Sequence, residues 1–183
     1  MSFTQRKRAE IIVNCYKKWD ISGKKILDVG CGNGVVSEVL QKNLNLDLCG
    51  TDIIDYRKIV MPFKKIEKVS KLPFEDSSFD YVMFNDVLHH TEDIEMAIAE
   101  GGRVGNSVLI FEDQSSFLLY MVDVALNRLY SSQMPCPLNF KTREQWCFLF
   151  DKLGFQYDIG EVSYPFFYPF KHMAFKLTKE RNE

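Results

Sequence analysis

The sequence lacks several features that would place it in a familiar non-globular or exported class. Its five cysteines are odd in number and form no C-x-x-C pair, which argues against a disulfide framework or a zinc site. No apolar stretch reaches the ~18 residues needed to span a bilayer, and the N-terminal segment has too short an apolar run for a secretory signal. With 23 basic and 25 acidic side chains, the net charge of -2 gives the chain no overall attraction to nucleic acid. We therefore expect a cytoplasmic protein with reduced thiols, no structural metal, no transmembrane segment and no nucleic-acid partner.

What is present describes an ordinary globular domain with an excess of aromatic side chains. Hydrophobic residues make up 46% of the 183 residues and charged residues 26%, a composition that excludes disorder. The chain length suits one core, and neither a repeat nor a linker divides it. Aromatic residues reach 14%, many of them in the C-terminal half.

The first two thirds of the chain alternate short apolar runs with amphipathic segments. This pattern predicts a parallel sheet covered on both faces, which is an α/β fold. We expect helices near 5–20, 35–44 and 93–104, and strands near 24–30, 46–53, 65–69, 80–86 and 107–112. The helix near 93–104 is expected to continue through Gly101 and Gly102, with Gly105 and Asn106 forming the turn before the next strand.

The remainder of the chain predicts two more helices and two more strands. An apolar helix is expected over 116–129, and Thr142 with Gln145 forms a capping box for a helix over 146–153 that Gly154 ends. Strands are expected over 155–164 and 172–179, joined by the Pro-aromatic segment 165–170.

The most informative segment is ILDVGCGNG, residues 26–34, at the carboxyl end of the first strand. Ligands of open α/β sheets bind there, because glycines let the backbone approach a ligand and the next helix presents free N–H groups. The dinucleotide fingerprint G-x-G-x-x-G needs a glycine where this chain has Val35, and the chain has an additional carboxylate at Asp28. A tight strand-to-helix turn with no ligand is the structural alternative.

Asp52 is placed 20 residues after Gly32, at the end of the second strand. An acidic side chain there can accept hydrogen bonds from both hydroxyls of a ribose, and Ile53 next to it offers an apolar face to adenine. Taken alone, Asp52 would be read as a solvated acid at a strand end. Together with the glycine segment it predicts a nucleoside ligand.

The chain resembles the class I S-adenosylmethionine-dependent methyltransferases, in particular the small-molecule, methyltransferase type 11-like members. The resemblance rests on residues 26–34, on Asp52, on LPFEDSSFDYVMFNDVLHH over 72–90 and on REQWCFLFDKLGF over 143–155. It implies a Rossmann-like, doubly wound, mostly parallel seven-stranded sheet with an antiparallel last strand. The family often has an acid for the adenine amino group where this chain has Lys68, so that Glu67 or backbone groups would take this role.

The resemblance also implies S-adenosylmethionine as the cofactor, with Asp28, Gly30 and Gly32 around its methionine part. One methyltransferase domain over 1–183 is expected, with an N-terminal helix in 1–22, a cofactor-binding half in 23–113 and an acceptor-side half in 114–183. The full set of expected cofactor-binding residues is Asp28, Gly30, Cys31, Gly32, Asp52, Ile53, Asn85 and Leu88.

Methyl transfer from a sulfonium needs alignment more than acid–base chemistry, so few catalytic side chains are expected. An oxygen acceptor must still lose its proton, and His89 and His90 are the only histidines expected near the cofactor edge, because His172 lies far along the chain. The alternative is that one of the pair packs and the other faces water. Glu112 and Asp113 end the fifth strand and could orient an amine or hydroxyl, or simply be solvated.

Two segments rich in large apolar groups, 117–130 and 164–170, are those that a family member would use to cover its acceptor. Core packing is the alternative for both. We therefore expect methyl transfer to a small acceptor that is apolar, aromatic or lipid-like, with peripheral contact to an apolar substrate. The other functions considered are a catalytically inactive methyltransferase-like binding module and, with less support, an RNA or protein methyltransferase guided by the basic first helix.

Overall fold

The computed structural model describes the chain except for residues 1–2, 115–138, 167, 169 and 180–183. The helix expected over 116–129 therefore lies outside the described residues. The described strands are β1 (Lys25–Val29), β2 (Asp47–Asp52), β3 (Phe63–Lys65), β4 (Phe79–Asn85), β5 (Gly105–Asp113), β6 (Phe155–Gly160) and β7 (His172–Lys179). The described helices are α1 (Phe3–Tyr16), α2 (Val35–Leu44), α3 (Ile94–Val104) and α5 (Arg143–Lys152), with 3-10 turns η1 (Lys17–Trp19) and η2 (Leu88–His90).

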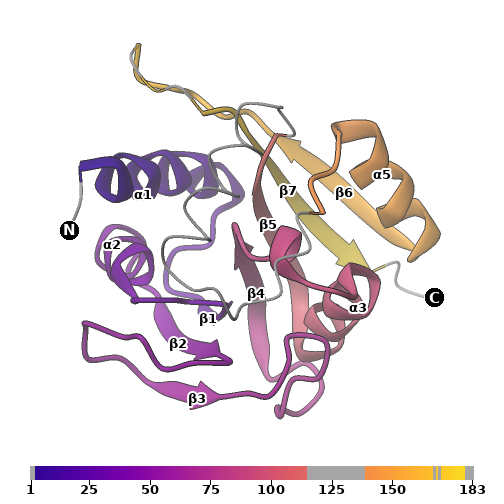
Figure 1. The fold of residues 1–183 in the computed structure, drawn as a ribbon, viewed down its shortest axis with the longest axis horizontal. Helices are drawn as coiled ribbons and strands as arrows, with labels where there is room; N and C mark the ends of the chain where they lie inside the picture. The colour runs from indigo at the N-terminus through magenta and orange to yellow at the C-terminus, as the bar shows by residue number, and fades with distance from the viewer. Residues whose placement is uncertain (1–2, 115–138, 167, 169, 180–183) are drawn as a thin grey trace, which may run out of the picture.

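The strands form one seven-stranded sheet in the order β3-β2-β1-β4-β5-β7-β6 (Figure 1). Strands β3, β2, β1, β4 and β5 pair in parallel, whereas β7 runs antiparallel to both β5 and β6. The α/β, Rossmann-like fold class is thereby confirmed. Since β7 runs in the opposite direction, its first residues lie at the edge where the parallel strands end.

Helices cover both faces of the sheet, and each face has its own apolar core. Helices α1 and α2 pack on one face, and α3 and α5 on the other (Figure 1). Side chains alternate between the two faces along each strand. In β5, for example, Leu109 and Phe111 belong to the core under α1, whereas Val108 and Ile110 belong to the core under α3.

The passage from α3 to β5 differs from the expectation. The helix does continue through Gly101 and Gly102, where a Cβ would lie 2.8 Å from Phe84 and 2.6 Å from Phe155 respectively, so that close approach to the sheet explains both glycines. The expected turn at Gly105 and Asn106 is wrong, because β5 begins directly at Gly105 with an extended φ of -110°. A Cβ on Gly105 would lie 3.0 Å from the backbone nitrogen of Val82, and this tight strand pairing leaves no room for a turn.

The third strand also differs, since it forms over Phe63–Lys65 rather than 65–69. It pairs with residues 50–52 at the end of β2, and a final hydrogen bond runs from the Ile66 N–H to the Asp52 carbonyl. Because β2 ends at Asp52, residues beyond Ile66 have no strand to pair with, which moves the third strand toward the N-terminus.

The C-terminal elements follow the sequence closely. The capping box forms on α5, with the Thr142 side chain and the Gln145 side chain each accepting from the other residue's backbone N–H. Gly154 follows the helix with a φ of +71°. Within the described part of the chain, no helix has the length and apolar character needed to cross a bilayer.

Candidate functional site

The loop between β1 and α2 holds three glycines in the left-handed region, with φ of +74° at Gly30, +54° at Gly32 and +77° at Gly34. The Gly30 and Cys31 amides both donate to the Thr51 carbonyl, at 2.8 and 3.2 Å, which ties the loop to the neighbouring strand β2. A Cβ on Gly30 would lie 2.3 Å from a methyl of Val87. Gly30 is therefore required by the contact between this loop and the turn after β4.

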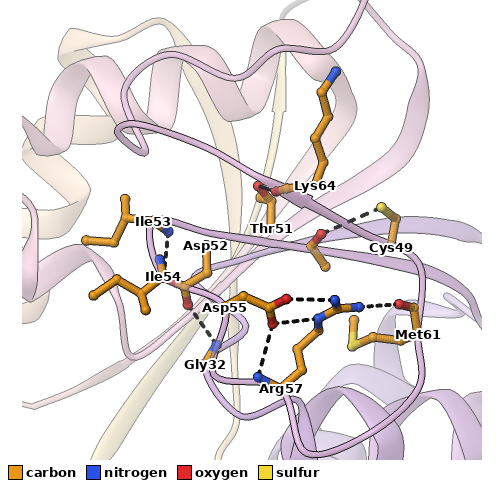
Figure 2. A network of polar contacts seen from close by, with 11 residues as sticks. Gly32, Cys49, Thr51, Asp52, Ile53, Ile54, Asp55, Arg57, Met61 and Lys64 are labelled. Atoms are coloured by element: carbon orange, nitrogen blue, oxygen red, sulfur yellow. Dashed lines mark hydrogen bonds and ion pairs between the residues drawn. The ribbon is translucent and has the colours of Figure 1, made fainter.

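Gly32 and Asp52 lie in direct contact, as their spacing in the sequence suggests (Figure 2). The Gly32 amide donates to Oδ2 of Asp52 at 2.8 Å, and the Ile53 amide donates to Oδ1 at 2.7 Å. No atom lies within 4 Å of a Cβ built on Gly32, so the space beside this glycine is open. Ile53 and Ile54, which are 43% and 38% exposed, add an apolar surface next to the carboxylate.

Sequence reasoning missed the loop that follows Ile54. Asp55 and Arg57 form a paired salt bridge, and Arg57 also donates to the Met61 carbonyl at 2.7 Å (Figure 2). The guanidinium lies 4.2 Å from the centre of the Phe63 ring. The hydrogen bonds from Arg57 lower the pKa of the Asp55 carboxyl to about 2. These contacts brace the chain segment that carries the exposed isoleucines.

Asp28 lies beneath the glycine loop and is only 2% exposed. Burial raises the pKa of its carboxyl to about 7, although the Ser37 hydroxyl, which donates to it at 2.5 Å, acts in the opposite direction. Nearby, the buried Tyr16 hydroxyl donates to Oδ1 of Asn85 at 2.7 Å. An acid kept in such surroundings at a cost to stability is typical of a binding site.

Glu112 organises the turn after β4 and is 1% exposed. Its Oε1 accepts from the Val87 and Leu88 amides at 2.9 and 2.7 Å, and its Oε2 lies 2.6 Å from Nδ1 of His89. His89 is buried and its ring stacks on Phe140. Glu112 is thus a buried acid that fixes η2 rather than a solvated acid at the end of a strand.

His90 follows His89 in the same turn and is partly exposed, with its ring centre 3.9 Å from that of His89. The surrounding protein, and after it the neighbouring His89 and Arg8, lower the pKa of His90 to about 4. Its imidazole is therefore neutral near pH 7. Leu88, in contrast, is 0% exposed and belongs to the core under α3.

His172 lies far along the chain, yet the sheet brings it to the edge where the parallel strands end. Asp113 ends β5 directly opposite His172, which begins β7, and Nε2 of His172 lies 2.8 Å from Oδ1 of Asp113. The contact forms because β7 pairs antiparallel with β5, and no local sequence pattern predicts it. Since successive side chains of a strand point to opposite faces, Asp113 faces α1 whereas Glu112 faces η2.

Of the two segments expected to cover an acceptor, 117–130 lies outside the described residues, and 164–170 is described except for positions 167 and 169. The Tyr164 hydroxyl donates to the His172 carbonyl at 2.8 Å, and the Tyr164 ring stacks on that of Tyr168. This segment joins β6 to β7 and so lies at the edge where the parallel strands end.

The comparisons agree with this geometry. Residues 27–107 match the family model of the methyltransferase domain. Among solved structures, a methyltransferase from Thermotoga maritima described as a possible histamine N-methyltransferase has a TM-score of 0.70 at 17% identity, covering 97% of this chain and 92% of its own. A cyclopropane-fatty-acyl-phospholipid synthase-like protein from Lactobacillus casei has a TM-score of 0.70 at 15% sequence identity. The match covers 96% of this chain and 92% of that protein.

A magnesium protoporphyrin IX methyltransferase from Synechocystis, solved with S-adenosylhomocysteine, gives a TM-score of 0.63 at 16% identity, covering 96% of this chain and 83% of its own. At these identities the likeness to solved structures shows the fold alone. No curated protein sequence matches the chain significantly.

The family model and the fold point to the same class of protein. The family-model match over residues 27–107 agrees with the resemblance to the class I S-adenosylmethionine-dependent methyltransferases that the motifs indicate, and the solved structures show the same fold over nearly the whole chain. The family supports methyl transfer as the activity and implies S-adenosylmethionine as the cofactor.

Asp28 makes the stability of the ligand-free protein depend on pH. In the unfolded chain its carboxyl ionises near pH 4, whereas in the folded chain it keeps its proton up to about pH 7. The free energy of unfolding therefore falls as pH rises from about 4 to about 7, by up to about 4 kcal/mol. We expect Asp28→Asn to remove this loss and to be more stable than wild type at pH 8, measured by urea unfolding from pH 5 to pH 8.

The control is Asp47→Asn, which removes an exposed carboxyl from the other end of β2. Its stability should follow that of wild type across the same pH range. If Asp28→Asn and Asp47→Asn gave the same pH dependence, the burial of Asp28 would not govern its protonation.

Proposed function

We propose that this protein transfers the methyl group of S-adenosylmethionine to a small acceptor that is apolar or aromatic. The observation that carries the proposal is the contact between the Gly32 amide and the Asp52 carboxylate, 2.8 Å apart, beside open space at Gly32. It joins a glycine loop to an acid at the end of the adjacent strand, the arrangement that binds a nucleoside in open α/β sheets.

The residues present fit this cofactor. Asp52 offers carboxylate oxygens to ribose hydroxyls, Ile53 offers an exposed apolar face to adenine, and Asp28 offers a buried acid toward a cationic amino group. Gly30, Cys31 and Gly32 would contribute backbone, and Asn85 a polar side chain at the end of β4. Leu88 would need a movement of the turn, because it is wholly buried and its amide is bound to Glu112.

When bound, S-adenosylmethionine supplies a methyl group already activated on a sulfonium, so the protein's part is to align the acceptor and remove its proton. His90 is the side chain that we propose as the base, since it is exposed and its imidazole is neutral at pH 7. His89 is a positioning residue, because Glu112 and Phe140 hold its ring.

The aromatic segment between β6 and β7 supports an apolar acceptor. Tyr164 and Tyr168 stack on one another, and Phe166 is 94% exposed at the same edge of the sheet. Similar folds carry names that refer to a porphyrin and to fatty-acyl phospholipids. We infer an acceptor of that character, reached by peripheral contact where it lies in a membrane. Conversion of S-adenosylmethionine to S-adenosylhomocysteine across amine, phenol, quinone and lipid acceptors tests the activity.

Replacing Gly32 should remove cofactor binding without unfolding the protein. The valine side chain of Gly32→Val would fill the open space beside the loop, and we expect calorimetry to show no heat with S-adenosylmethionine. Gly23→Val is the matched control, because Gly23 also has a positive φ (+71°) and open space but lies in the turn before β1. Both variants should lose a similar ~1–2 kcal/mol of stability from backbone strain. Equal loss of binding in both would mean that Gly32 acts through the fold.

Asp52→Ala should weaken S-adenosylmethionine binding by about 1–3 kcal/mol, since the ribose hydroxyls would lose a charged acceptor. Asp47→Ala, at the exposed start of the same strand, should bind as wild type does. Titration calorimetry measures both. Unchanged affinity in Asp52→Ala, or heat with NAD in place of S-adenosylmethionine, would contradict the assignment.

The pH profile of turnover distinguishes His90 from a base of ordinary pKa, and the His90→Gln variant distinguishes it from no base at all. A base must be deprotonated, and with its pKa near 4 the imidazole stays deprotonated down to about pH 5. Activity should therefore be nearly flat from pH 8 to pH 5.5, where a histidine of ordinary pKa would have lost about nine tenths of it. His90→Gln should lower turnover by ~10²–10⁴-fold. A loss of only a few fold would exclude His90 as the base.

A further inference from the structure

Three potential metal ligands converge at the edge of the sheet beneath α1. Asp86 follows β4, Asp113 ends β5 and His172 begins β7, so the three side chains come from three adjacent strands. One ligand atom from each lies within 4.8 Å of the others. Within the described part of the chain, no other set of three such residues meets this criterion.

The ligand atoms are buried and poorly satisfied by hydrogen bonds. The side chains of Asp86 and His172 are 3% and 2% exposed, and that of Asp113 is 17% exposed. Neither oxygen of Asp86 accepts a hydrogen bond. Nε2 of His172 lies 2.8 Å from Oδ1 of Asp113, yet this oxygen too is without a well-directed hydrogen bond. Buried carboxylate oxygens are nearly always hydrogen-bonded or bound to a cation. Asp86 here contacts the Arg8 guanidinium and Asp113 contacts the His172 ring, and neither contact has hydrogen-bond geometry.

The backbone and the surrounding rings hold the ligands in place. Asp86 has a φ of +52°, a left-handed conformation that is uncommon outside glycine, and its amide donates to the Phe111 carbonyl at 2.7 Å. The His172 ring stacks on Phe111 and lies beside Tyr168. Two of the three ligands are thus oriented before any ion arrives.

A cation from the protein itself already contacts the cluster. The Arg8 guanidinium reaches from α1 to Oδ2 of Asp86 as an ion pair, while its own Nε is buried without a hydrogen-bond partner. The Arg8 side chain is 33% exposed, so it has a path to solvent. The ion pair indicates that the two carboxylates attract positive charge. Because the guanidinium makes no well-directed hydrogen bond to them, Arg8 leaves their hydrogen-bonding capacity partly unused.

We propose that Asp86, Asp113 and His172 bind a divalent transition-metal ion, with Arg8 moving aside to solvent. Two carboxylates and one imidazole are ligands that Mn²⁺ and Zn²⁺ accept, and three protein ligands leave coordination positions open. The spacing of cysteines in the sequence gave no sign of this site, because its ligands are carboxylates and a histidine from distant strands. The proposal does not depend on methyl transfer.

Mn²⁺ is the probe for this site, because it prefers carboxylate and imidazole to thiolate and so avoids the free cysteines. Titration of the full chain without cofactor, followed by the electron paramagnetic resonance signal of free Mn²⁺, should show one saturable site. Asp113→Asn and His172→Gln should each weaken binding at least about tenfold. Asp158→Asn, which removes an exposed acid on β6, is the matched control and should bind as wild type does.

Arg8→Ala should change Mn²⁺ affinity in the opposite direction to the ligand variants. With the competing guanidinium removed, Mn²⁺ affinity should rise by on the order of tenfold. A purely structural role for the cluster would not produce this gain. Thermal unfolding of each variant verifies that it is folded. Absence of saturable Mn²⁺ binding to the wild type overturns the proposal, and so does a loss of affinity in Asp158→Asn equal to that in Asp113→Asn.

Discussion

The buried carboxylate of Glu112 is the constraint on which the candidate site depends. It accepts the Val87 and Leu88 amides and contacts His89, so that one side chain from β5 fixes the whole turn after β4. Val87 in turn packs against Gly30 so closely that no Cβ would fit there. The same acid therefore helps to place both the glycine loop and the two histidines. It does so although β2, β3 and β4 lie between the loop and Glu112 in the chain.

Two further acids, Asp28 and Asp52, lie at the glycine loop in different surroundings. The Asp52 carboxylate accepts hydrogen bonds from the Gly32 and Ile53 amides. Asp28 is enclosed by protein, and burial raises the pKa of its carboxyl to about 7. A cationic ligand group beside Asp28 would favour the ionised form of its carboxyl.

The parts of the site that could be predicted from the sequence are those encoded locally. The glycine loop, the 20-residue spacing to Asp52 and the capping box of α5 all follow from patterns within short segments. The ends of β3 and β5 were misjudged, because they are set by where the neighbouring strand ends and how closely it approaches.

The cluster of Arg8, Asp86, Asp113 and His172 could not be predicted, because it depends on the register of β7 against β5 and on which face each residue takes. Nothing in the sequence distinguishes Arg8 from the other basic residues of the first helix. Its side chain reaches Asp86 because α1 packs against this face of the sheet. Glu112 and Asp113 looked alike in the sequence, and the alternation of the strand gives them different partners.

The position of β7 between β5 and β6 has a consequence for how the chain is assembled. During synthesis β6 is made before β7, and until residues 172–179 are available both β5 and β6 present an unpaired edge. Neither strand can complete its hydrogen bonding with the part of the chain already made. Pairing of β7 therefore completes this side of the sheet late in synthesis. A nascent chain that stops before His172 would leave both β5 and β6 with unpaired edges that can pair with other chains.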